Sequence, residues 1–454
     1  MAEAIFQITQ QIRDLAQICT TRDKIDGALY QEYDVKRGLR DLNGKGVLAG
    51  LTNISEVNAK KIVNGEEVPC AGELFYRGYN VKDLTAGFLA DDRFGFEEIT
   101  YLLLFGELPT KKQLDDFCFE LGQRRMLPQN FVRDVIMKAP SENLMITLAK
   151  SLLTLYSYDN DAENTSVPNV MRQCLNLISQ FPMLAVYSYQ AYNHSIGNSL
   201  YIHMPDQNLS TAENILLMLR PDRSYTQFEA KVLDLALILH MEHGGGNNSS
   251  FTTRVVTSSG TDTYSVMAAA LASLKGPRHG GANIKVVQMF DDMKSKISDW
   301  KDEDAVSNYL ENILMKNEFD RSGLIYGVGH AIYSVSDPRA EIFKKFVGDL
   351  AHEKGLDDEF ALYTLVEKLA PKIIANKRKM YKGVNTNVDF YSGFMYRTLG
   401  LPEELFTPMF AAARVVGWSA HRLEEIISAE KIIRPAYMSV AERREYVGMN
   451  QRDN

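Results

Sequence analysis

Polar side chains that could do acid–base chemistry gather in four glycine-rich stretches of this 454-residue chain. Three stretches carry histidines and the fourth carries an aspartate instead: LILHMEHGGGNNSS (237–250), SLKGPRHGGAN (273–283), GLIYGVGHAIYSVSDPRA (323–340) and YKGVNTNVDFYSG (381–393). Each follows or interrupts sequence with the apolar spacing of a helix. Polar residues that emerge from the ends of buried helices are well placed to line an internal cleft, so these stretches form the candidate active site.

His279 lies in a turn made by Pro277 and its neighbouring glycines, shortly before an expected helix at Asn283–Met293. Pro277 cannot continue the preceding helix, and glycines allow backbone conformations that other residues resist. The N–H groups at a helix start disfavour a protonated imidazole. The functional interpretation is a neutral histidine that donates a hydrogen bond, and the alternative is a histidine packed structurally in a tight turn.

His330 follows Gly327-Val328-Gly329, a segment flexible enough to bring backbone N–H groups near a ligand. Asp337-Pro338-Arg339 stands just downstream and adds a guanidinium near the same segment. The alternative is again a packed turn histidine, with Asp337 and Arg339 forming a local ion pair worth about 0–1 kcal/mol.

Asp389 stands between a valine and two aromatic residues in NVDFY. Partial removal from water would raise the pKa of this carboxylate and make it a stronger base. The alternative is an aspartate that caps the following helix.

Arg414 lies in the strongly apolar segment TPMFAAARVVGWSA. A guanidinium on such a helix must reach water or meet an anion, because an unpaired buried charge is costly. Glu424 and Glu425 are candidate partners within the protein, and a ligand carboxylate held by two hydrogen bonds would serve equally well. Arg434 stands before Pro435 at the expected exit of a helix. It is either a binding residue or a solvated surface arginine.

The composition is that of a globular protein, with 45% hydrophobic and 24% charged residues and a net charge of −8. The negative charge argues against a broad nucleic-acid surface, and no run of about 18 apolar residues predicts a membrane span. The first residues read as neither a secretory signal nor a transit peptide. Four widely spaced cysteines without a CxxC pair are typical of reduced thiols, so we expect a cytoplasmic protein with no nucleic-acid or membrane partner.

Two common cofactor signatures are absent. His240-Met241-Glu242-His243 is neither HExxH nor HxxEH, so we expect no metal site. GGGNN lacks the Lys-Ser/Thr of a Walker loop, and no βαβ unit surrounds it.

The fold expected from periodicity is mainly α, with a small β element near residues 47–79 around an Asn64-Gly65 turn. The helix at Lys231–Leu239 is apolar on nearly all sides and should be buried.

Six motifs, taken in their order along the chain, resemble the motif series of citrate synthases: HGGGN, GPRHGGAN, GVGHAIYSVSDPRA, NVDFYSG, ARVVGW and IIRPAY. The resemblance runs from TNISEVN and GELFYRGY to Arg434 and covers most of the chain. It implies a two-domain, all-helical homodimer with its active site between the domains. The large domain would hold residues 1–281 and 395–454, and the small domain residues 282–394.

The resemblance also implies an acyltransferase of the tricarboxylic acid cycle, which condenses acetyl-CoA with oxaloacetate and water to give citrate and CoA. Asp389 would remove a methyl proton of acetyl-CoA, His279 would hydrogen-bond the thioester oxygen, and His330 would hydrogen-bond the oxaloacetate carbonyl. The oxaloacetate carboxylates would be held by His243, Arg339, Arg414 and, from the other subunit, Arg434.

We expect CoA contacts from Gly327, Val328 and Gly329, with its phosphates bound by Lys382 or by arginines of the partner subunit. Ser334 departs from the family pattern, in which a long polar residue at this position often meets a CoA phosphate. The CoA thioester is a substrate, and the implied chemistry calls for no metal or other cofactor.

Three alternatives remain open. A 2-methylcitrate synthase would use the same residues on propionyl-CoA. A non-catalytic relative would only bind CoA or a dicarboxylate. A helical scaffold would leave the ordered polar motifs unexplained.

Overall fold

The computed structural model describes residues 8–41, 46–329, 332–378, 384–428 and 431–452. The chain divides into two compact units, residues 1–51 and 52–454. The first unit contains α1 (Gln10–Arg22), α2 (Leu29–Glu32) and the short turn η2 (Arg37–Leu39), none of which buries a side chain. Thr9 caps α1 by accepting a hydrogen bond from the N–H of Ile12.

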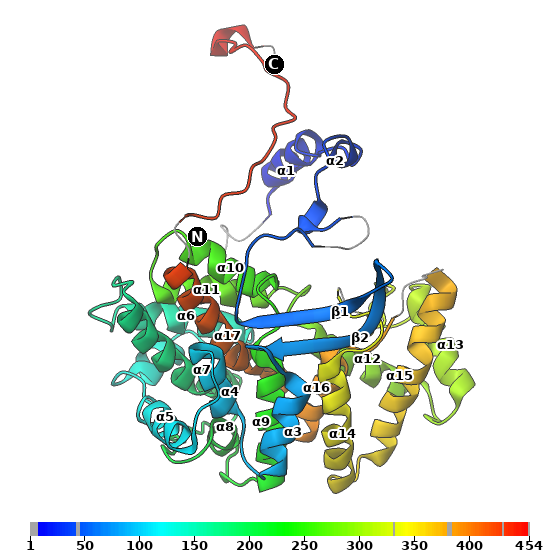
Figure 1. Ribbon diagram of the computed structural model, residues 1–454. Helices are drawn as coiled ribbons and strands as arrows, with labels where there is room; N and C mark the ends of the chain where they lie inside the picture. Colours follow the sequence, from blue (N-terminus) through cyan, green and yellow to red (C-terminus); the bar gives the residue numbers. More distant parts are fainter. Residues whose placement is uncertain (1–7, 42–45, 330–331, 379–383, 429–430, 453–454) are drawn as a thin grey trace. The chain divides into compact units, whose positions relative to one another are not determined.

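The second unit is built mainly from helices (Figure 1). Its elements are, in order, β1 (Ser55–Val63), β2 (Glu66–Tyr76), β3 (Tyr79–Asn80), α3 (Val81–Ala90), α4 (Phe96–Phe105), α5 (Lys111–Gln123), η3 (Val132–Ile136), α6 (Leu144–Tyr156), α7 (Val167–Ser195), α8 (Thr211–Leu219), α9 (Gln227–Met241), α10 (Asn248–Thr257), α11 (Thr263–Leu274), α12 (Ala282–Lys296), α13 (Glu303–Leu314), α14 (Pro338–Glu353), α15 (Asp357–Arg378), α16 (Val388–Thr398), η4 (Glu403–Leu405), α17 (Phe406–Ser428) and η5 (Met449–Gln451).

The three strands form one antiparallel sheet in the order β1-β2-β3. Val63 pairs with Glu66 across a two-residue turn. Asn64 and Gly65 both have positive φ, 54° and 84°, which is the geometry that matches the twist of a hairpin. The hairpin packs on α3 and α14, as Figure 1 shows.

Helix α17 is the centre of the core, and it packs on α4, α7, α9 and α10. Its side chains are buried from Phe406 to Leu423 because alanines, valines and aromatic residues occupy every face. Helix α9 is likewise buried from Val232 to Met241, and Thr226 and Glu229 form a capping box at its start. A helix that is apolar all round must lie inside the protein, so the ends of α9 and α17 bring their polar residues into the interior.

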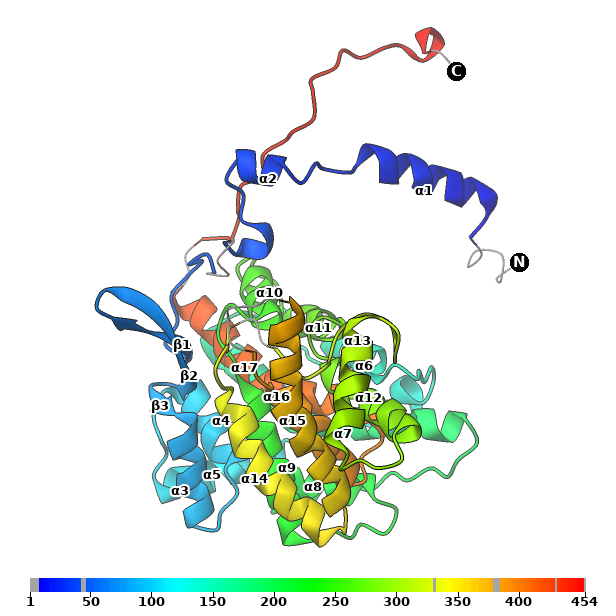
Figure 2. The same ribbon diagram turned by 90° about the vertical axis from the view of Figure 1, so that its right-hand side faces the viewer.

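Helices α12 to α16 pack largely on one another, α12 and α14 both against α16, and α13 and α14 both against α15. Figure 2 shows α14 and α15 running side by side. Helix α14 also contacts α9, so this group of helices packs on the buried core helix α9.

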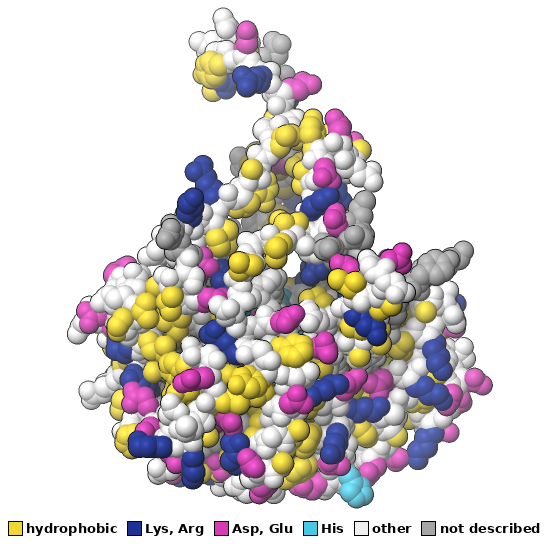
Figure 3. All heavy atoms as spheres, viewed as in Figure 1, with side chains coloured by type: hydrophobic (Ala, Val, Ile, Leu, Met, Phe, Trp, Pro, Cys, Tyr) yellow, Lys and Arg dark blue, Asp and Glu magenta, His cyan; other side chains and the backbone are white. Residues whose placement is uncertain are grey.

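On the face shown in Figure 3, acidic and basic side chains are interspersed. Among the helices of the described ranges, none combines the length and the apolar run that a membrane crossing needs. The four cysteines are all free thiols.

The mainly α fold with a small β element at residues 47–79 is confirmed, as is the buried helix around Lys231–Leu239. The strand ladder begins at Ser55 rather than near Val47, because Thr52 and Asn53 bond to the carboxylate of Glu424 on α17 instead of to a strand. The division into residues 1–281 plus 395–454 and 282–394 stays a prediction.

The close approach of α17 to α9 gives a stability prediction. A Cβ at Gly417 would lie within 3.0 Å of the carbonyl oxygen of Met241 and the carboxylate of Glu242. Gly417→Ala should lower the free energy of unfolding by about 1–3 kcal/mol, because a packed core does not yield to an added methyl group. Scanning calorimetry measures the change. Gly87→Ala on the exposed side of α3, where no atom lies within 4 Å, is the control and should stabilise by about 0.5–1 kcal/mol. Equal midpoints for the two variants would contradict the close contact.

Candidate functional site

The C-terminal end of α9 presents His243 directly after the buried helix. Glu242 is the C-cap residue of α9 in an extended conformation. Its carbonyl oxygen and that of Ile238 lie 3.1 Å from the Tyr76 hydroxyl, which donates to them. The ring of His243 is buried and packs edge-on against Tyr333, with 5.5 Å between the centroids. A strand residue and a loop residue therefore fix the turn that carries His243.

His240, one turn earlier on α9, is packed in the hydrophobic core instead. Its Nδ1 lies 2.8 Å from the carbonyl oxygen of Ala236, and its ring packs on Phe410 and Phe343. Burial lowers the pKa of His240 to about 3, so the ring is neutral. Among the described residues, no group of three or more His, Cys, Asp or Glu side chains could hold a metal ion.

Arg414 is 1% exposed and has no acidic side chain in ion-pair contact within the described ranges. Its Nε donates to the carbonyl oxygen of His240 at 2.6 Å, and its guanidinium lies 4.7 Å from the Phe410 ring centroid. Nη1 has no hydrogen-bond partner among the described residues. Burial lowers the pKa of Arg414 to about 10, although Glu242 nearby opposes the shift. The partners considered from the sequence, Glu424 and Glu425, pair with Arg254 instead.

Arg339 forms a buried, two-pronged ion pair with Asp337, at 3.0 and 2.8 Å. The local ion pair considered as an alternative is thus present, but at 4% and 0% side-chain exposure it is not a surface pair. Asp337 also caps α14 by accepting from the N–H of Arg339. Burial works against the charge of Arg339, but Asp337 outweighs it, so the pKa of Arg339 is raised.

His279 lies in the turn before α12, as the sequence predicts, with its N–H bonded to the carbonyl oxygen of Gly276. Its Nε2 lies 3.0 Å from Oγ of Ser249. Ser249 accepts a hydrogen bond from the indole of Trp418 and lies 3.0 Å from Oδ1 of Asn247. Burial, reinforced by the positive charge of Arg414, lowers the pKa of His279 to about 4. The imidazole is therefore neutral at physiological pH.

Asp389 lies in the first turn of α16, and it is not the cap of that helix. Asn387 is the cap, because its side chain accepts from the N–H of Asp389. Burial raises the pKa of Asp389 to about 6, and the charges of Arg339 and Arg414 offset this only in part. The carboxylate is thus a stronger base than an ordinary aspartate.

The Gly327-Val328-Gly329 segment lies against the residues that lead into α16. Gly329 donates to the carbonyl oxygen of Asn385 at 2.7 Å, and Val328 donates to that of Ile325. These two N–H groups already have partners, and Gly327 and Gly329 have positive φ of 76° and 103°. His330 and Lys382 lie outside the described residues, and contact of this segment with CoA stays a prediction.

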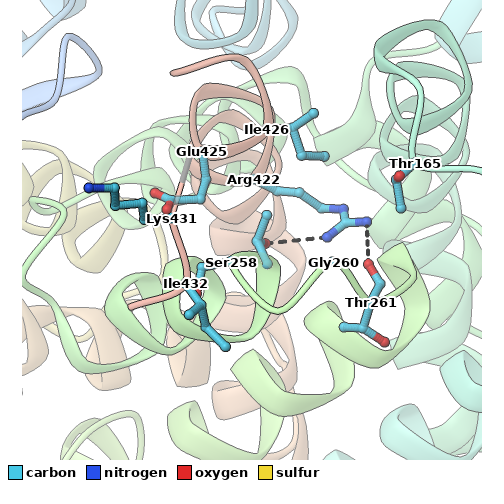
Figure 4. Close-up of a pocket in the computed structure, with 10 residues that line it drawn as sticks. Thr165, Ser258, Gly260, Thr261, Arg422, Glu425, Ile426, Lys431 and Ile432 are labelled. Atoms are coloured by element: carbon cyan, nitrogen blue, oxygen red, sulfur yellow. Dashed lines mark hydrogen bonds between the residues drawn. The ribbon is translucent and has the colours of Figure 1, made fainter. Parts of the chain in front are cut away.

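Arg434 does not join the other predicted residues. It is exposed, in a segment without regular structure that follows Ile433, whose N–H bonds to Ser258. A cavity of about 210 Å³ lies nearby between the ends of α10 and α17 (Figure 4). No predicted site residue lines it, and its buried Arg422 is bonded to Thr257, Thr263 and the carbonyl oxygen of Thr261.

Phe410 connects the predicted residues. Its ring contacts the Arg414 guanidinium and lies 6.4 Å from the His279 ring, and Arg414 in turn acts electrostatically on Asp389 and Arg339. The structure therefore brings His279, Arg339, Asp389 and Arg414 together from four different helices or their flanking turns. Sequence reasoning missed the residues that hold them, which are Tyr76, Ser249, Tyr333, Phe410 and Trp418. Ser249 and Tyr333 lie in two of the glycine-rich stretches, Phe410 and Trp418 lie in the apolar segment around Arg414, and Tyr76 lies in GELFYRGY, but no local pattern marked their supporting roles.

Known proteins are similar to this chain over most of its length. A family profile described as "Citrate synthase, C-terminal domain" matches residues 41–436. The chain is 33% identical to citrate synthase of Synechocystis over 388 residues, 84% of this chain and 88% of that protein. It is also 33% identical to 2-methylcitrate synthase of Shewanella oneidensis, over 82% of this chain and 90% of that protein.

Solved structures show the same likeness. Citrate synthase of Thermoplasma acidophilum, in a ternary complex with carboxymethyl coenzyme A and oxaloacetate, superposes with a TM-score of 0.74 at 28% identity, covering 92% of this chain and 99% of that one. Citrate synthase of Thermotoga maritima gives 0.69 at 29% identity, covering 90% and 98%. The chain belongs to the citrate synthase family, whose members are acyltransferases. The resemblance, the enzyme class and the mainly helical fold class are confirmed, and the two-domain division and the homodimer stay predictions.

The raised pKa of Asp389 makes a prediction about stability. The carboxyl has a pKa of 3.8 when unfolded and about 6 when folded, so the folded protein holds the proton more tightly. The contribution of Asp389 to stability is full below pH about 4 and is lost as the pH rises through about 6. Asp389→Asn should therefore stabilise the protein by up to about 3 kcal/mol at pH 7.5 and by about half as much at pH 5. Thermal midpoints of both proteins at both pH values test this, and a gain that is larger at pH 5 would contradict it.

Proposed function

We propose that this protein condenses acetyl-CoA with oxaloacetate and water to give citrate and CoA. The observation that carries the proposal is one buried site that combines a carboxylate base, Asp389, a neutral histidine, His279, and two buried guanidiniums, Arg339 and Arg414. The names of several relatives at 33–34% identity support the same reaction.

Proton removal is the first step. The methyl proton of a thioester is a very weak acid, so a carboxylate alone would remove it slowly. Asp389 takes the proton, and its pKa of about 6 makes it a stronger base than an ordinary aspartate. The negative charge moves to the thioester oxygen, where a placed donor is worth about 3–4 kcal/mol.

His279 is that donor. A neutral imidazole carries one proton, and Nε2 faces Ser249. The Ser249 hydroxyl donates to Oδ1 of Asn247 in the structure. Rotation of that hydroxyl toward Nε2 places the ring proton on Nδ1, where it can bond the thioester oxygen. The low pKa of His279, about 4, keeps the ring in this neutral form.

Oxaloacetate supplies the electrophile. Arg414, Arg339 and His243 hold its carboxylates, and the unpartnered Nη1 of Arg414 is suited to one of them. The enol carbon attacks the ketone carbon, and the ketone oxygen takes a proton with the support of His330. Water then cleaves the resulting thioester and releases citrate and CoA. Gly327, Val328, Gly329 and Lys382 are the residues proposed to contact CoA.

Closure of the small domain, residues 282–394, on the large one would exclude water from the enolate. The protein acts as a cytoplasmic homodimer without a resident metal or cofactor. Arg434 reaches the oxaloacetate of the partner subunit, and its exposure away from Arg414 on its own chain is consistent with such a role.

The acyl group is the point on which relatives differ, because one relative at 33% identity is named 2-methylcitrate synthase. Comparison of kcat/KM for acetyl-CoA and propionyl-CoA decides between the two activities. We expect acetyl-CoA to be preferred by at least about 10-fold, since one methylene is worth about 1–3 kcal/mol. A preference for propionyl-CoA would assign the second activity.

Turnover should depend on Asp389 and on pH. Oxaloacetate-dependent release of free thiol from acetyl-CoA should fall by at least about 10³-fold in Asp389→Asn, while calorimetry still shows oxaloacetate binding. In the wild type, kcat/KM should fall about tenfold per pH unit below about pH 6, because protonated Asp389 cannot accept a proton. A wild type without such release would rule out the proposed reaction.

Hybrid dimers test the role of Arg434. Asp389→Asn and Arg434→Gln chains are each inactive as homodimers under this proposal. In a random mixture of co-expressed chains, half the dimers are hybrids, and each hybrid restores one site if Arg434 acts across the interface. Activity should return to about one quarter of the wild-type value. A mixture that stays inactive would place Arg434 on its own subunit's site.

A further inference from the structure

Glu242 lies behind the oxaloacetate-binding residues and is fully buried. Arg414, Gly417 and His421 recur at helical spacing along α17 and share the face that meets the end of α9. The absence of a side chain at Gly417 lets the Glu242 carboxylate approach the helix closely. The carboxylate therefore lies between Arg414 on one side and His421 on the other.

His421 is fully buried and orders this carboxylate. Its Nε2 lies 3.1 Å from Oε1 of Glu242, a close ion-pair contact that lacks hydrogen-bond geometry, and its Nδ1 lies 2.7 Å from Nη2 of Arg254. A guanidinium can only donate, so Nδ1 accepts and the ring proton is on Nε2, on the side of Glu242. The tautomer of His421 is thus fixed by Arg254.

Arg254 is itself held in place. It pairs with Glu424 and, at 3.1 Å, with Glu425. Glu424 also accepts from the Thr52 hydroxyl and from the N–H of Asn53, both at 2.7 Å. These contacts tie α10 and α17 to the segment that enters β1.

Ser55, at the start of β1, connects Glu242 to the other side of His243. Its hydroxyl donates to Oε1 of Glu242 at 2.9 Å and accepts from the N–H of Gly244 at 3.2 Å. The residues before and after His243 are therefore both bonded to one serine, while Tyr76 holds the carbonyl of Glu242. The position of His243 depends on where the Glu242 carboxylate lies.

We propose that His421 is a positioning residue for oxaloacetate binding, acting through Glu242 and Ser55 on His243 and Arg414. The proposal rests on the proposed function, in which His243 and Arg414 hold substrate carboxylates. Oε2 of Glu242 and Nη1 of Arg414 both lack partners among the described residues, and the two side chains form no ion pair there. Without the His421 ring in contact with it, the carboxylate turns to Arg414, occupies the guanidinium and competes with the substrate.

His421→Leu should raise the oxaloacetate KM by about 10–100-fold and leave the acetyl-CoA KM within about 3-fold, because only the carboxylate-binding face is disturbed. His421→Gln should recover most of the loss, since an amide can donate to Glu242 and accept from Arg254. Ser55→Ala, at the half-buried edge of the network, is a milder variant and should raise the oxaloacetate KM by about 3–10-fold.

Ser419→Ala is the matched control, because its buried hydroxyl bonds to the carbonyl oxygen of Val415 within α17 and to the Cys174 thiol on α7 rather than to Glu242. A variant that merely destabilised the fold would lower kcat through a smaller active fraction and leave both KM values unchanged. The proposal is overturned if His421→Leu or Ser55→Ala leaves the oxaloacetate KM unchanged, or raises both KM values equally. Calorimetry measures oxaloacetate binding to the same variants without any turnover. If the wild type proved inactive, the proposed reaction would be wrong, but the effect of His421 on oxaloacetate affinity could still be measured.

Discussion

The buried charge of Arg414 is the constraint on which the rest of the site depends. A guanidinium in a helix of alanines, valines and aromatic residues is expensive unless an anion meets it. In this protein the nearest acid, Glu242, is held by His421 and Ser55, and the carbonyl oxygen of His240 satisfies one edge of the guanidinium. The remaining edge is left for a ligand. The buried guanidinium of Arg414 is thus shielded from water and positioned to bind a carboxylate.

The same dry environment shifts the other groups in useful directions. Burial raises the pKa of Asp389 and lowers the pKa of His279, so one becomes a better base and the other stays a neutral donor. Each shift costs stability, and the packing of α9, α14, α16 and α17 offsets that cost. Arg339 shows the contrasting case, because Asp337 already neutralises it and fixes it in place. A site with one paired guanidinium and one that has no acid in ion-pair contact among the described residues can bind a dicarboxylate without being closed by its own acids.

The sequence predicted the fold class and the main residues because their signals are local. The apolar spacing of residues 231–239, the Asn64-Gly65 turn and the glycine-rich stretches each follow from neighbouring residues in the chain. The supporting contacts are not local. Ser249 meets His279 across 30 residues, and Tyr76 meets Glu242 across 166. No periodicity marks such pairs, and only the packing of the helices reveals them. Glu424 and Glu425 were considered as partners for Arg414 by nearness in sequence, but helix geometry turns them toward Arg254.

Oxaloacetate binding to Arg414→Gln tests the central claim most directly. Titration calorimetry at pH 7.5 compares the wild type with Arg414→Gln and with Arg422→Gln, a buried arginine two turns further along α17. The account predicts a loss of affinity of at least about 30-fold for Arg414→Gln, as expected when one partner of a desolvated charge pair is removed. It predicts a change of less than about 3-fold for Arg422→Gln, whose hydrogen bonds end on threonines away from the site. Unchanged affinity in Arg414→Gln would contradict the claim that this buried charge exists to receive a substrate carboxylate.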